Sequence, residues 1–294
     1  MTQPATVETA KGTKPPENQA AQISWTHLRM PPFPQVALKV LQLASNENVQ
    51  LSRLGELISS DPAFASEVLT VVNSLLYAPR YPIRSILQAI EVLGANHLQG
   101  LCLTVGVRAY LGKSLGHPTM RTLWRHNMAC ALIAQQIASA GTTDRDIAYT
   151  AGVLHGIGML ALAVIQPREY IDLLGTFIGT SASILDRERL AFGIDHCELG
   201  QKLISDWNLP EDFAAVMAAA HLPGIAGQWG VTEIVGLSCR MADTAGFSAF
   251  SACHAAPFEE LLQELPPRER KLFHTDVETL SFEVSKKISA LESI

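Results

Sequence analysis

The chain has 294 residues, of which 48% are hydrophobic and 17% are charged, so it contains enough apolar material for a substantial buried core. Its 28 acidic residues outnumber its 22 basic ones and give a net charge of −6, which excludes broad, sequence-independent binding to nucleic acid because that binding needs many cationic contacts with phosphate. The five cysteines are odd in number and form no Cys-x-x-Cys pair, so neither a disulfide framework nor a thiolate zinc knuckle is favoured.

The first 22 residues are rich in Thr, Pro, Ala and Gln and contain almost no large apolar side chains, which predicts a disordered segment over 1–22. No basic stretch followed by an apolar one is found there, so we expect a cytoplasmic location. The nearly uncharged run 147–165 is about long enough to span a bilayer. It is interrupted by His155 and by glycines, so we predict a buried core helix and no membrane contact.

The pattern that follows is helical almost throughout, since few runs of alternating β-branched residues occur. Apolar residues at helical spacing predict helices after Pro34 and from Leu51. Asp61-Pro62 predicts a helix start, because Asp is a good cap and Pro suits the first helical position. Gly94 predicts a helix end. The aromatic and basic loop 77–84 could meet a partner or a nucleotide, although surface loops often have this composition without a ligand.

A second block of helices begins near His117-Pro118. Its predicted helices are about 119–140, 145–165, one opened by Pro210, 231–246 and 273–291. Asp195 followed three residues later by Glu198 matches a reciprocal helix cap, which places His196 in the first turn of a helix. The helix that Pro210 opens runs toward His221.

Several short motifs, taken in order, resemble the HDOD family, the HD-related output domains of bacterial signalling. The motifs are Met30-Pro31-Pro32-Phe33-Pro34, Leu57-Ile58-Ser59-Ser60-Asp61-Pro62, Ala89-Ile90-Glu91-Val92-Leu93-Gly94, Trp124-Arg125-His126, Leu154-His155-Gly156 and Phe192-Gly193-Ile194-Asp195-His196. The resemblance covers roughly residues 25–250 and implies an all-α, two-lobed fold. We expect an N-terminal lobe over 25–115, an HD-like lobe over 116–255 and C-terminal helices over 256–294 that pack on the HD-like lobe.

The HDOD family is similar to the HD phosphohydrolases and to their cyclic di-GMP-cleaving HD-GYP branch, in which histidines and aspartates bind one or two metal ions. The resemblance implies metal positions at His126, His155 and Asp243, with His196 and His221 where the HD-GYP pattern carries further ligands. The usual carboxylate after the central histidine is replaced by Gly156. The histidines could equally be hydrogen-bonded core residues that bind no metal.

The resemblance implies a non-catalytic signalling or regulatory module that acts by binding another protein. No catalytic residue and no cofactor are expected. The alternative is a metal-dependent phosphohydrolase in which His126, His155 and Asp243 hold a single divalent ion at a site with open positions. A DNA-binding regulator is disfavoured by charge, and no residue pattern supports a cyclic dinucleotide ligand.

Overall fold

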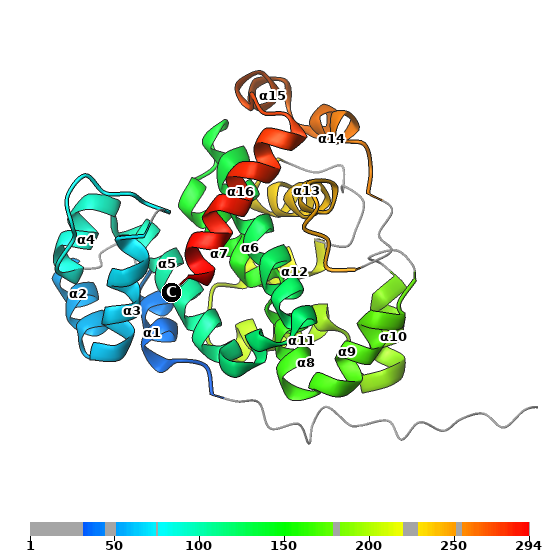
Figure 1. The fold of residues 1–294 in the computed structure, drawn as a ribbon, viewed down its shortest axis with the longest axis horizontal. Coiled ribbons are helices and arrows are strands. Elements are labelled where there is room, and N and C mark those ends of the chain that lie inside the picture. The colour runs from blue at the N-terminus through cyan, green and yellow to red at the C-terminus, as the bar shows by residue number, and fades with distance from the viewer. Residues whose placement is uncertain are drawn as a thin grey trace, which may run out of the picture.

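A computed structural model of the chain describes residues 32–44, 51–74, 76–178, 183–219, 229–250 and 255–293. Within these ranges every regular element is a helix, which confirms the all-α prediction (Figure 1). The elements are α1 (Gln35–Ala44), α2 (Leu51–Ser59), α3 (Pro62–Val72), α4 (Ile86–Leu93), α5 (Ala95–Leu111), η2 (Gly112–Gly116), α6 (Pro118–Ser139), α7 (Arg145–His155), α8 (Ile157–Ile165), α9 (Pro167–Thr176), α10 (Ser183–Phe192), α11 (His196–Asp206), α12 (Glu211–Ala219), α13 (Val231–Thr244), α14 (Phe258–Glu264), α15 (Pro267–Leu272) and α16 (Val277–Glu292). The segment predicted to be disordered, 1–22, lies outside the described residues.

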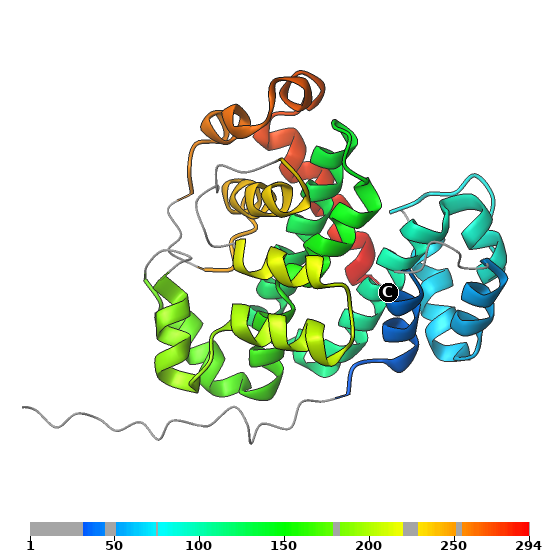
Figure 2. The same cartoon turned by 180° about the vertical axis from the view of Figure 1, so that it is seen from behind.

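The N-terminal helices α1–α4 form a small lobe to one side, and α5 leads from it into the larger lobe (Figures 1 and 2). The predicted cap is present: Asp61 Oδ1 accepts hydrogen bonds from the backbone N–H groups of Ala63 and Phe64, both at 3.1 Å. The Asn73 side chain donates to the Ile83 carbonyl and accepts from the Ile83 N–H, each at 2.8 Å. This two-way pairing fixes the loop between α3 and α4 and gives Asn73 a structural role.

The long helix α6 forms the centre of the larger lobe, where α7, α13 and α16 pack against it. Glycines allow two pairs of helices in the larger lobe, α6 with α7 and α8 with α11, to approach closely. A Cβ atom on Gly152 would lie 2.5 Å from the Cα of Ala131, and one on Gly158 would lie 1.9 Å from the carbonyl oxygen of His196. In both cases the obstacle is backbone, which a rotating side chain cannot relieve, so α6 meets α7 and α8 meets α11 only through glycine.

The prediction of a single helix over 145–165 is wrong at its middle, because the structure has two helices, α7 and α8, separated at Gly156. The Gly156 N–H bonds to the nearby Leu154 carbonyl, and its backbone ψ of 6° departs from helical geometry. The segment Arg145–Ile165 is apolar and long enough to cross a membrane, but 89% of its most apolar window is buried inside the fold. The predicted core role of this segment is therefore confirmed.

The C-terminal helix α16 lies along α6, and its end reaches the N-terminal lobe, where Ala290 and Ser293 share a hollow with residues of α3 (Figure 1). This helix begins later than the predicted residue 273. Asp276 caps it by accepting a hydrogen bond from the Thr279 N–H at 2.8 Å, and the separate short helix α15 precedes it.

The two lobes also meet through the turn after α11. The Trp207 ring packs on Phe33 with centroids 4.7 Å apart, and the Trp207 carbonyl accepts a hydrogen bond from Gln42 Nε2 at 2.7 Å. The N-terminal lobe is thereby attached directly to the helix that carries His196 at its other end.

Replacement of Gly158 by alanine should lower the free energy of unfolding by about 3 kcal/mol or more, because the added methyl group meets the backbone of α11. Chemical denaturation measures the change. Gly175→Ala is the matched control, since no atom lies within 4 Å of its added Cβ, and it should leave the stability unchanged or slightly higher. Equal stability of the two variants would contradict the close α8–α11 contact.

Candidate functional site

A small cavity of about 30 Å³ lies inside the larger lobe, between α6, α7, α8, α11 and α13. Four of the five residues predicted to bind metal lie in described parts of the chain, and all four line this cavity. They are His126, His155, His196 and Asp243. The fifth, His221, lies outside the described residues. The structure therefore places four of the predicted residues around one cavity, although their individual contacts differ.

His126 is held by its Nδ1 atom, which lies 2.8 Å from the carbonyl oxygen of Phe247. A carbonyl only accepts, so Nδ1 carries the proton and donates. The carboxylate of Asp243 lies on this same side of the ring, with Oδ1 3.6 Å from Nδ1. The other nitrogen, Nε2, faces Cys130 Sγ at 3.5 Å and presents a lone pair when the ring is neutral.

His155, the last residue of α7, is oriented in the same way, because its Nδ1 lies 2.5 Å from the Gly152 carbonyl oxygen. Its remaining ring nitrogen is left to face the interior beside Cys239. Burial by itself would lower the pKa of His155, but the neighbouring Cys239 sulfur raises it overall. Both histidines thus use a backbone carbonyl to fix the tautomer that leaves Nε2 available.

Two cysteines complete a group that the sequence analysis did not identify. One ligand atom from each of His126, Cys130, His155 and Cys239 lies within 4.8 Å of the other three, and all four residues are buried. We refer to these four residues as the Cys-His cluster. Cys130 lies one turn after His126 on α6, and Cys239 lies one turn before Asp243 on α13. That spacing was the available signal, but it is weaker than a Cys-x-x-Cys pair.

The thiols of the two cysteines both have strongly perturbed pKa values. The pKa of Cys239 is lowered well below that of an ordinary thiol because Cys130 hydrogen-bonds to it and His155 lies beside it, and these effects outweigh its burial. The pKa of Cys130 is raised, first by burial and then by its hydrogen bond with Cys239. Cys239 is therefore the more acidic thiol of the pair.

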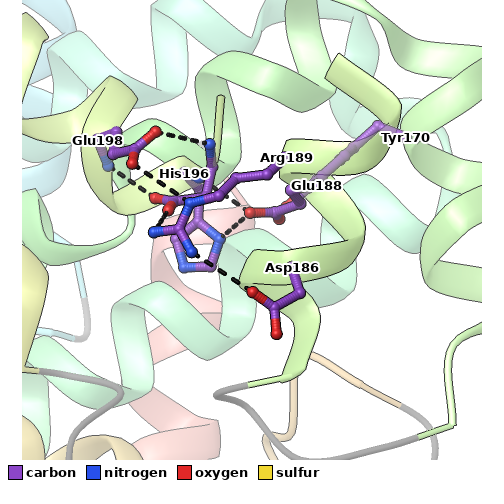
Figure 3. A network of polar contacts seen from close by, with 7 residues as sticks. Tyr170, Asp186, Glu188, Arg189, His196 and Glu198 are labelled. Atoms are coloured by element: carbon purple, nitrogen blue, oxygen red, sulfur yellow. Dashed lines mark hydrogen bonds and ion pairs between the residues drawn. The ribbon is translucent and has the colours of Figure 1, made fainter. Parts of the chain in front are cut away.

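His196 is engaged by a different partner, Glu188 on α10. His196 Nδ1 lies 2.6 Å from Glu188 Oε2, and the backbone N–H of His196 donates to the same oxygen at 2.9 Å. The Tyr170 hydroxyl donates to Glu188 Oε1 at 2.6 Å (Figure 3). Glu188 and Tyr170 are fully buried, and His196 is only 2% exposed. This buried triad ties α9, α10 and α11 together.

The predicted reciprocal cap lies beside this triad. Glu198 N–H donates to Asp195 Oδ1 at 2.8 Å, and Asp195 N–H donates to Glu198 Oε2 at 3.4 Å. Arg189 forms ion pairs with both carboxylates and with Asp186 (Figure 3). The predicted position of His196 in the first turn of its helix is thereby confirmed. Its partner Glu188 gave no sequence signal, because it lies in the charged run Asp186-Arg187-Glu188-Arg189, a pattern typical of a solvent-exposed helix face.

Gly156 faces a filled space. A Cβ atom at this position would lie 2.4 Å from Asn127 Oδ1. Asn127 is fixed there because its Nδ2 donates to the Val153 carbonyl at 2.9 Å. The place where the HD pattern carries a carboxylate is thus closed by an amide that belongs to the neighbouring helix.

Comparison with protein families gives a match to the HDOD domain over residues 30–223. The chain belongs to the HDOD family. Among solved structures, this HDOD protein is similar to an HDOD domain protein of unknown function from Geobacter sulfurreducens, with 20% identity, a TM-score of 0.66 and coverage of 91% of this chain and 92% of that one. It is also similar to a protein from Shewanella amazonensis that is described provisionally as a phosphohydrolase, with 20% identity, a TM-score of 0.63 and coverage of 90% and 94%.

A curated relative from Treponema pallidum (strain Nichols), whose function is uncharacterised, is 28% identical over 186 residues. The matched region is 62% of this HDOD chain but only 36% of that relative. The structural likenesses, at this level of identity, show the HDOD and HD-like helical fold and no activity.

The ion pair of His196 with Glu188 makes the stability of the HDOD protein depend on pH. Burial alone would lower the pKa of His196, but the Glu188 carboxylate raises it from the ordinary 6.5 to about 10. Protonated His196 therefore contributes its full stabilisation of the fold below pH 6.5. This contribution is lost as the pH rises toward 10.

We therefore expect Glu188→Gln to lower the free energy of unfolding by about 3–5 kcal/mol below pH 6.5, where a buried cation loses its partner. The difference from the unaltered protein should shrink as the pH rises toward 10. Denaturation curves of the two proteins across this range measure it. A difference that stays constant with pH would show that His196 is not a buried cation.

Proposed function

We propose that this HDOD protein is a non-catalytic regulatory module of cytoplasmic signal transduction and that it acts by binding another protein. The observation that carries the proposal is the closed position at Gly156. A hydrolytic HD centre needs a carboxylate there to supply charge and to bridge metal ions, so that the pKa of a bound water falls. In this chain the position is Gly156, whose side chain is a single hydrogen atom, and Asn127 Oδ1 fills the space beside it.

The remaining groups fit an open hydrolytic metal centre poorly. Asp243 is nearest to His126 on the Nδ1 side of the ring. A metal ion would have to bind at Nε2, on the other side of the ring. Burial alone would lower the pKa of His196, but Glu188 raises it to about 10, so at neutral pH both ring nitrogens carry protons and neither offers a lone pair to a metal ion. Asp243 and His196 are therefore poorly arranged to complete a catalytic centre with the available Nε2 atoms of His126 and His155.

The cavity is also small for a substrate. Its volume of about 30 Å³ suits one ion or one water molecule. Pockets that bind nucleotide-sized ligands usually measure about 300–1,000 Å³. This size favours a structural centre over a site that admits a cyclic dinucleotide.

A surface suited to a protein partner lies on the N-terminal lobe. The loop before α4 and the outer face of α4 expose three large apolar side chains, Tyr81, Leu87 and Val92, at 69%, 51% and 58%. The Arg80 guanidinium lies over the Tyr81 ring at 5.6 Å from its centroid. Exposed apolar and aromatic side chains beside an arginine are typical of protein interfaces, so we assign partner binding to the segment 80–92.

The absence of catalysis predicts that purified protein supplied with Mn²⁺, Mg²⁺ or Fe²⁺ does not hydrolyse cyclic di-GMP or bis(p-nitrophenyl) phosphate above a metal-only blank. Product release measured by chromatography and absorbance checks this. Hydrolysis that His155→Ala abolishes would support the alternative, a phosphohydrolase with a reduced ligand set, and would contradict the proposal.

The protein-binding role predicts that a photo-crosslinking amino acid at position 81 or 87 forms a covalent adduct with one discrete protein in the native cell. The same amino acid at Phe282 on α16 is the control, because that side chain, at 70%, is at least as exposed as either test position but belongs to another helix. Mass spectrometry identifies the adduct. Adducts at all three positions, or at none, would contradict the assignment to segment 80–92.

A further inference from the structure

The Cys-His cluster has the donor atoms of a structural zinc site. Tetrahedral zinc binds cysteine sulfur at about 2.3 Å and histidine nitrogen at about 2.0–2.1 Å, which separates neighbouring ligand atoms by about 3.3–3.8 Å. The four ligand atoms already lie within 4.8 Å of one another, and His126 Nε2 is 3.5 Å from Cys130 Sγ. Small side-chain rotations would bring all four atoms to bonding distance of one ion.

Both histidines are prepared for metal binding by their second hydrogen bond. A histidine that binds metal through one nitrogen almost always donates its other N–H to a carboxylate, a carbonyl or water. The Nδ1 atoms of His126 and His155 contact the carbonyls of Phe247 and Gly152. The lone pairs of both rings are thus directed into the cluster by backbone atoms that cannot rotate away.

The chemistry of the donors selects the metal. Two thiolates and two neutral imidazoles in a tetrahedral arrangement suit zinc, whereas the hard ions Mg²⁺ and Mn²⁺ prefer carboxylate, carbonyl and water oxygens. Two thiolates also cancel the charge of Zn²⁺. The filled site is therefore neutral, as burial among apolar helices requires.

We propose that His126, Cys130, His155 and Cys239 form a closed, four-ligand site for one zinc ion that fastens α6, α7 and α13 together. All four ligand positions are supplied by protein, so the ion has no open position for water or substrate. The site differs from the predicted set of His126, His155 and Asp243 by its two sulfur ligands. It also goes beyond the proposed protein-binding role, because it concerns the interior of the larger lobe and not the surface 80–92.

The first experiment measures metal content. The full chain is purified under reducing conditions by a method that uses neither immobilised metal nor chelator, and elemental mass spectrometry should find about one zinc per chain. Cys239→Ser and Cys130→Ser should each reduce zinc at least tenfold. Asp243→Asn and the buried-cysteine control Cys102→Ser, which lies on α5 outside the cluster, should retain it.

The second experiment identifies the ligands independently of any variant. Zinc is removed from the unaltered protein with a chelator and replaced by Co²⁺. The proposed site should give sulfur-to-cobalt charge-transfer absorption in the near ultraviolet and intense tetrahedral bands in the red. Removal of zinc should also lower Tm by about 5–10 °C, because the ion binds only the folded chain.

Three results would overturn the proposal. One is zinc-free protein whose cobalt form lacks the sulfur band. Another is a Cys130–Cys239 disulfide found by mass spectrometry of protein prepared under reducing conditions. The third is zinc that survives loss of both cysteines but not Asp243→Asn, which would indicate the open His126–His155–Asp243 site. Phosphodiester hydrolysis alongside sulfur-bound zinc would instead contradict only the proposed non-catalytic function.

Discussion

The close approach of α6 and α7 at Ala131 and Gly152 determines where the polar side chains of the core can lie. A Cβ at Gly152 would meet the Cα of Ala131 at 2.5 Å, so the two helices are as near as backbone allows. Cys130 is adjacent to the first of these residues, and His155 lies one turn beyond the second and is bonded to its carbonyl. One small residue therefore sets both the distance between the helices and the direction of an imidazole ring.

The interior accommodates two groups of ionisable side chains in different ways. Around Glu188 every partner is a protein group: Tyr170 and His196 supply the donors, and the imidazolium balances the carboxylate. Around Cys239 the group consists of two thiols and two imidazoles, none of which carries a fixed charge. The first group pairs its charges within the protein, whereas the second places four donor atoms together with no cation of its own.

Much of the fold could be predicted from local chemistry. The caps at Asp61 and Asp195 and the helix end at Gly94 need only neighbouring residues, and the structure contains all three. The break at Gly156 could not be predicted in the same way, because it accompanies packing against Asn127, a residue of another helix. Three glycines and His155 interrupt the apolar run 147–165, and local chemistry alone does not indicate at which of them the helix breaks.

The site was predictable in its location and less so in its composition. His126, His155, His196 and Asp243 line one cavity as expected, since all are positions of a known pattern. Cys130 and Glu188 belong to no such pattern, and their roles depend on which helix faces each of them. A thiol one turn from a histidine is a common accident of sequence, and only the crossing of α6, α7 and α13 places it beside a second thiol.

Helix α11 gives these interior groups a mechanical connection to the N-terminal lobe. Its first residue, His196, lines the cavity, and Trp207 directly after its last residue packs on Phe33 and accepts a hydrogen bond from Gln42. A helix of 11 residues is a stiff rod of about 16 Å. Displacement of His196 along the rod axis would therefore shift Trp207 by a similar distance, so the cavity and the N-terminal lobe lie at the two ends of one rigid element.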